Sequence, residues 1–120
     1  MSQAARSLFV FGFYILGLGA VLLVVPNVAL KVFGFPPTQE VYIRIAGMFL
    51  VFLAVYDILA ARAELRDFIR WTVPVRASVI GFFAVFVLLG FAKPVLLLLS
   101  LVDLASAAWT GWALKKDSAA

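Results

Sequence analysis

Long apolar runs separated by short polar segments dominate the chain. A membrane-spanning helix needs about 20 mostly apolar residues, and four stretches meet this requirement. They cover approximately residues 8–25, 41–61, 69–89 and 94–114. We therefore expect an all-α fold, an integral membrane four-helix bundle that forms a single membrane domain over residues 1–120.

The connection after the first span is more apolar than an ordinary loop. Pro26 suits the first turn of a new helix, whereas Gly34 and the pair Pro36-Pro37 would end one. Two interpretations remain open. The segment forms a short helix at the outer membrane interface, or the first helix continues past a kink at Pro26.

Basic residues are distributed unequally around the four spans. Six lie on the side that holds both termini and the middle loop, and two lie on the other side. Because Lys and Arg concentrate in cytoplasmic loops, we expect cytoplasmic N- and C-termini in a multi-pass protein of a bacterial cytoplasmic membrane. The larger group is Arg6, Arg62, Arg66, Arg70, Lys115 and Lys116, and the smaller group is Lys31 and Lys93.

The composition narrows the class of protein further. Of the 120 residues, 66% are apolar and only 13% are charged. A soluble domain of this size has too much surface to hide so many apolar side chains. The chain has no Cys and no His, which excludes disulfides, thiolate metal sites and histidine general bases. The net charge of +4 forms no basic stripe, so nucleic-acid binding is not expected.

Apart from Arg70 at the cytoplasmic end of the third span, four ionisable residues lie inside the predicted spans: Arg44, Asp57, Arg76 and Asp103. A charge in hydrocarbon costs at least about 2.5–3.5 kcal/mol, so we expect these groups to neutralise one another. Depths calculated at about 1.5 Å per residue match Asp57 with Arg76. They also predict that the long Arg44 side chain spans the difference in depth to Asp103. Both ion pairs are predicted to lie inside the bundle.

These buried pairs allow a structural and a functional interpretation. A structural pair fixes helix register and the choice of partner, whereas a functional set relays protons or ions, or recognises a headgroup or quinone. Asp103 is nearest to the midplane, where transporters place their sites. Ser100, Ser106 and Thr110 could complete a candidate polar pocket around it. No constellation of nucleophile, acid and base is present, so we expect no catalytic residue, no metal site, no cofactor and no enzyme activity.

Small residues repeat at intervals of seven in the first two spans. Gly12 and Gly19 share one face of the first, and Gly47, Ala54 and Ala61 share one face of the second. Small side chains let helix backbones approach closely in lipid. This pattern predicts close helix packing.

Short motifs lie at fixed places in the four-span layout: Gly17-Leu18-Gly19 before Pro26-Asn27, Arg44-Ile45-Ala46-Gly47, Tyr56-Asp57 before Ala60-Ala61-Arg62, and Asp103 before Trp109-Thr110. On these motifs the chain resembles small four-span bacterial membrane proteins grouped as DoxX-like or left uncharacterised. Some DoxX relatives are thought to be subunits of quinone-linked oxidoreductases, so the resemblance implies a quinone-related role. No residue of the chain maps onto a known catalytic role.

We expect a small non-enzymatic integral membrane protein, a structural or accessory subunit or a homo-oligomer held by buried ion pairs. Its expected partners are membrane lipids and either further copies or a larger membrane complex. One alternative is a small proton- or ion-coupled secondary transporter that uses Asp103 or Asp57. Small multidrug-resistance exporters share its size and span count, but their essential carboxylate lies in the first helix, which has no acid here. The other alternative is a small membrane subunit of a quinone-linked oxidoreductase.

Overall fold

The computed structural model describes residues 1–119 and consists of helices joined by short turns. No strand occurs in this described part of the chain. Four helices are long and apolar enough to cross a membrane, which confirms the all-α prediction and the number of candidate spans. In chain order the elements are α1 (Gln3–Val24), α2 (Pro26–Val32), α3 (Val41–Arg62), α4 (Arg66–Leu88), the 3-10 turn η1 (Pro94–Leu96) and α5 (Leu97–Ala119).

Three of the long helices extend beyond the predicted apolar runs. Helix α1 begins at Gln3, α4 begins at Arg66, and α5 continues to Ala119. The added residues are mostly polar or small. The helices include them because backbone hydrogen bonding continues after the apolar run has ended. At the start of α1, the Ser2 side chain accepts a hydrogen bond from the Ala5 amide at 3.1 Å. This cap satisfies an amide that the first helical turn leaves free.

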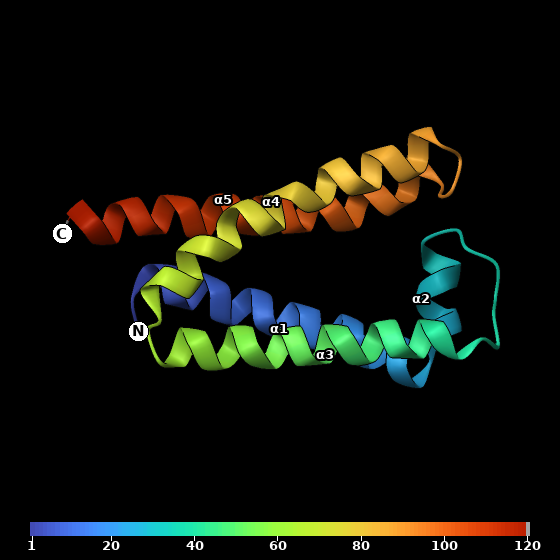
Figure 1. Cartoon of the computed structure of the whole chain (residues 1–120), viewed down its shortest axis with the longest axis horizontal. Coiled ribbons are helices and arrows are strands. Elements are labelled where there is room, and N and C mark those ends of the chain that lie inside the picture. The colour runs from blue at the N-terminus through green and yellow to red at the C-terminus, as the bar shows by residue number, and fades with distance from the viewer. Residues whose placement is uncertain (120) are drawn as a thin grey trace.

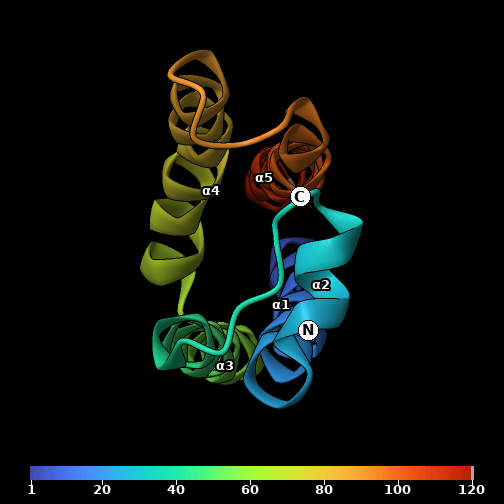
Figure 2. The ribbon, with the colours of Figure 1, turned by 90° about the vertical axis from the view of Figure 1, so that its right-hand side faces the viewer.

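The long helices form two antiparallel pairs (Figure 1). Helix α1 packs mainly on α3, α4 packs on α5, and α1 also contacts α5. The consecutive helices α3 and α4 touch very little. Viewed from the end, the order around the bundle is therefore α3, α1, α5 and α4, an open arc and not a closed ring (Figure 2).

The α1–α3 interface is built on small residues, as their spacing predicts. A Cβ placed on Gly19 would lie 2.9 Å from the Gly47 carbonyl oxygen and 2.9 Å from the Val51 amide nitrogen. A Cβ on Gly47 would lie 2.7 Å from the Leu23 amide nitrogen. Side chains at these two positions would force the backbones apart. Ala54 on the same face of α3 is completely buried.

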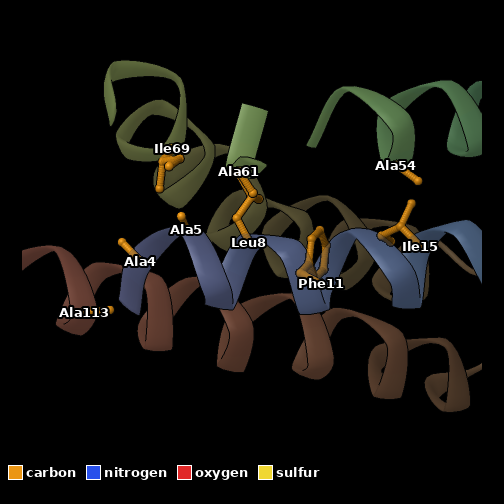
Figure 3. Close-up of a cluster of buried hydrophobic side chains, with 9 residues drawn as sticks. All are labelled: Ala4, Ala5, Leu8, Phe11, Ile15, Ala54, Ala61, Ile69 and Ala113. Carbon is orange, nitrogen blue, oxygen red and sulfur yellow. The ribbon is translucent and has the colours of Figure 1, made fainter. Parts of the chain in front are cut away.

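The hydrophobic core lies around the N-terminal half of α1 (Figure 3). Leu8 and Ile69 are its largest fully buried apolar side chains. Many other large apolar side chains point outward, among them Leu88, which is 85% exposed. A soluble monomer rarely exposes so much contiguous apolar surface. The core residues are Ala4, Ala5, Leu8, Phe11, Ile15, Ala54, Ala61, Ile69 and Ala113.

The segment after α1 forms a separate helix, which decides between the two interpretations of Pro26. Val25 leaves the helical conformation (φ −132°, ψ 62°), and α2 then runs across the axis of α1 (Figure 1). Gly34 ends this helix at φ +79°, a conformation that costs glycine little. The Phe35 amide closes the turn by donating to the Leu30 carbonyl at 2.8 Å.

Candidate functional site

Arg76 on α4 is the most extensively hydrogen-bonded charged side chain inside the candidate spans. It is only 6% exposed. Its Nε donates to the Thr72 carbonyl at 3.3 Å, and its Nη1 donates to Ser106 Oγ at 3.2 Å. Its Nη2 donates to Thr72 Oγ1 at 3.2 Å and to Thr110 Oγ1 at 2.8 Å. Its guanidinium carbon also lies 4.7 Å from the centre of the Phe11 ring.

These contacts join three helices. Thr110 on α5 also hydrogen-bonds Ser7 on α1, with 2.6 Å between the two hydroxyl oxygens. Both residues are completely buried. The guanidinium is thereby fixed at the α1–α4–α5 junction, and its orientation is set by hydroxyl groups and a backbone carbonyl.

A cavity of about 350 Å³ lies beside this network. Leu53 on α3 and Val75 on α4 line it and are 54% and 66% exposed, so the cavity opens outward between these two helices. Almost all of its lining is apolar apart from Asp57, Thr72, Arg76 and Asp103. The remaining lining residues are Phe11, Ile15, Leu50, Phe68, Trp71 and Val79.

Asp57 and Arg76 line the same cavity, as their matched depths suggest, but they do not form the predicted ion pair. No Asp57–Arg76 contact falls within the 4.0 Å limit for a salt bridge. Arg76 instead directs its donors to the hydroxyls of Ser106, Thr110 and Thr72. The Asp57 carboxylate forms no hydrogen bond with any described residue, and Asp57 lines the cavity as a half-buried residue.

The predicted pairing of Arg44 with Asp103 is wrong. Arg44 is exposed, and its Nη1 donates to the Leu23 carbonyl at 2.6 Å and to the Val24 carbonyl at 3.2 Å. These carbonyls end α1, where the chain turns at Val25 and the next helical turn supplies no amide. A cation is favoured at such a helix C-terminus, so Arg44 caps the neighbouring helix.

The predicted polar pocket is also arranged differently. Asp103 lines the cavity, but no hydroxyl from a described residue reaches its carboxylate. Ser106 and Thr110 accept from Arg76, because they lie one and two helical turns beyond Asp103 and level with the guanidinium. Ser100 is buried and donates to the Leu97 carbonyl at 2.7 Å.

Asp103 stands where two cavities meet. A second cavity of about 370 Å³ extends toward α2, and Tyr14 and Leu30 lie in its wall. Asp103 and the apolar residues Ile15, Leu50 and Val79 line both cavities. One half-buried acidic residue is therefore shared by the walls of both cavities.

The site offers charge and hydrogen bonding in an apolar setting, but little reactive chemistry. Among residues 1–119, no group of three or more His, Cys, Asp or Glu residues is placed to hold a metal ion. The cavity lining contains no Ser nucleophile next to a base. Its chemical capacity is to bind a molecule with an apolar body and a polar or charged head.

Comparison with protein families, curated proteins and solved structures adds no relative. No match is found in any of the three. The DoxX-like resemblance remains a likeness of layout. What the fold establishes is a small helical protein with four helices suited to crossing a membrane.

Sequence patterns did not predict three residues of the Arg76 network: Ser7, Phe11 and Thr72. One of them, Ser7, carried a usable signal. Ser7 and Phe11 lie one turn apart on α1, and their shared face includes the buried residues Ala4 and Ile15. A polar residue on an otherwise apolar packing face has to find a partner on another helix.

Proposed function

We propose that this chain is a multi-pass protein of a bacterial cytoplasmic membrane with both termini on the cytoplasmic side. Four apolar helices and an outward-facing apolar surface support insertion into a bilayer. Both termini lie at one end of the molecule, together with the turn between α3 and α4 (Figure 1). The larger group of basic residues falls on the segments at this end, the distribution typical of a cytoplasmic face.

Within that membrane, the protein acts as a non-enzymatic accessory subunit that binds an amphipathic molecule dissolved in the bilayer. The observation that carries this proposal is the cavity between α3 and α4. Its volume of about 350 Å³ lies within the range of roughly 300–1,000 Å³ common for small-molecule sites. Its opening between two sparsely contacting helices would admit a molecule from the lipid side.

Native mass spectrometry from lipid nanodiscs tests this function. The wild-type protein should retain a small molecule, while Val79→Phe should lose it because the larger ring fills both cavities at their junction. Val85→Phe is the matched control, since Val85 lies on the same helix, is exposed and lines neither cavity. Equal retention by Val79→Phe and the wild type would contradict the proposal.

The same spectra would report whether the chain is a homo-oligomer or part of a larger complex. A retained quinone would favour an oxidoreductase subunit.

A second candidate function is proton- or ion-coupled transport through Asp103. It is favoured by the position of this carboxylate at the junction of the two cavities. In liposomes carrying an internal pH dye, an imposed potential should drive a proton flux that Asp103→Asn abolishes. Asp67→Asn is the control because Asp67 is exposed and pairs with Arg70 outside the cavities. A flux unchanged by Asp103→Asn would exclude this function.

A further inference from the structure

The charges around the α3–α4 cavity are not balanced within the protein. Two carboxylates, Asp57 and Asp103, and one guanidinium, Arg76, line its wall. Arg76 uses four donor contacts on Thr72, Ser106 and Thr110 and makes no salt bridge within 4.0 Å to any of residues 1–119. The carboxylates accept no hydrogen bond from any described residue. The cavity therefore offers two acceptor groups whose donors have to come from elsewhere.

The position of Arg76 decides which kind of head group suits the space. The guanidinium is turned toward the α1–α5 side, where Phe11 covers it at 4.7 Å and Thr110 holds it at 2.8 Å. An anionic head would have to displace these contacts and approach two carboxylates. A cationic head is instead attracted by both carboxylates, and with Arg76 present the total charge of the site is small once the cation is bound.

The rest of the wall suits an apolar body. Phe68 and Trp71 lie at the end nearer the α3–α4 turn, and Leu50, Leu53 and Val79 line the remaining length. The face of an aromatic ring attracts cations as well as hydrocarbon. The cavity thus combines an apolar wall, open to the outside of the bundle, with two acidic residues among those that line it.

We propose that the α3–α4 cavity binds an amphipathic amine, with its ammonium group held between Asp57 and Asp103 and its apolar part lying along α3 and α4. A primary ammonium has three donors, enough to serve both carboxylates at once. This inference rests on the proposed binding function and adds the chemical class of the ligand.

Two probes of similar length test the proposal. Decylamine is protonated near neutral pH because alkyl ammonium groups titrate near the value of lysine, about 10.4. Decanol carries a neutral hydroxyl on the same chain. Binding of each is measured by native mass spectrometry on the protein in phosphatidylcholine nanodiscs, with empty nanodiscs correcting for partition into lipid. The wild type should bind decylamine at least about tenfold more tightly than decanol, a difference of about 1.4 kcal/mol.

Substitutions that remove one charge then test whether Asp57 and Asp103 cause the preference for decylamine over decanol. Asp57→Asn and Asp103→Asn each keep the side-chain volume, and each should lower the preference for decylamine about fivefold or more while leaving decanol binding unchanged. Asp67→Asn, which removes an exposed carboxylate outside the cavity, should retain the full preference. Circular dichroism and size exclusion verify folding, and Asp57→Glu or Asp103→Glu should restore the preference where Asn lowers it. If one Asn variant fails to fold, the other decides.

The outcomes separate this inference from the proposed function. Equal binding of decylamine and decanol, with both reduced by Val79→Phe, would overturn the amine assignment and leave a neutral-ligand site. A preference for decylamine that persists in both folded Asn variants would also overturn it. Binding of both probes unaffected by Val79→Phe would refute the cavity as a site, and the proposed function would fail with it.

Discussion

Helix α3 has two very different neighbours. Toward α1 it presents Gly47 and Ala54, and the two backbones come so close that a single added Cβ at Gly47 would lie 2.7 Å from a backbone atom of α1. Toward α4 it presents Leu53 and Asp57, and a cavity separates the two helices along this side. One helix thus forms the most extensive interface of the bundle and one of its sparsest.

The proposed membrane setting accounts for this difference. Lipid tails are as apolar as leucine, so no hydrophobic effect drives bulky side chains of two helices together in a bilayer. Close packing of small residues stabilises α1 against α3 through van der Waals contact. A side with large residues has no such drive to close, and the α3–α4 cavity stays available to a ligand.

The largest effect is expected from filling the tight interface. Gly19→Ala should destabilise the protein by up to about 3 kcal/mol, because its new methyl group meets backbone atoms at 2.9 Å that cannot rotate away. Thermal unfolding in detergent or nanodiscs measures the change. Gly17→Ala on the same helix has open space within 4 Å and should be neutral or slightly stabilising. Equal melting temperatures for the two variants would show that α1 and α3 do not approach as described.

An intermediate effect is expected at the network that fixes α4 to the rest of the bundle. Arg76→Lys keeps the charge but loses the planar fork that reaches Thr72, Ser106 and Thr110, and should cost about 1–3 kcal/mol. Urea or thermal unfolding of the reconstituted protein provides the measurement. Arg70→Lys, at an exposed pair 3.5 Å from Asp67, should change stability by less than about 0.5 kcal/mol. If Arg76→Lys lost no more stability than Arg70→Lys, the hydrogen bonds of Arg76 would not hold α4 in place.

The smallest effect is expected at the turn that joins α3 to α4. Glu64 has φ +54°, and its carboxylate accepts from the Ser2 amide at 2.6 Å and from Ser2 Oγ at 2.8 Å. Glu64→Gln removes the charge from these exposed bonds and should cost less than about 1 kcal/mol. Glu40→Gln is the control, since Glu40 precedes α3 without a side-chain capping bond. In differential scanning calorimetry, Glu64→Gln should have a lower melting temperature than Glu40→Gln. The reverse order would refute the contact between Glu64 and Ser2.

Much of this comparison could be predicted from the sequence. The length and hydropathy of the apolar runs predict the four long helices, and the seven-residue spacing of Gly19 with Gly12 and of Gly47 with Ala54 predicts close packing. The depth of Asp57 and Arg76 predicts that they share a level of the bundle, which agrees with their common cavity.

The direct partners of the charges could not be predicted in the same way. Depth constrains one coordinate only, whereas a contact also needs the rotation of each helix about its axis and the order of helices around the bundle. Arg44 has nearby carbonyls at the end of α1, and Arg76 has hydroxyls on two turns of α5, which satisfy each guanidinium before a carboxylate is reached. A prediction that pairs each Arg with an Asp leaves out these neutral acceptors.

The contact of Arg44 with the last carbonyls of α1 restricts relative motion. Gly19 and Gly47 prevent α1 and α3 from rotating against each other, because any larger neighbour brought to that point would collide. Arg44, bound to the Leu23 carbonyl at 2.6 Å, opposes sliding, since a shift by one helical turn of about 5.4 Å would break that bond. With rotation and translation both opposed, we expect α1 and α3 to move together, and we expect a change in the width of the cavity to come from displacement of α4 and α5.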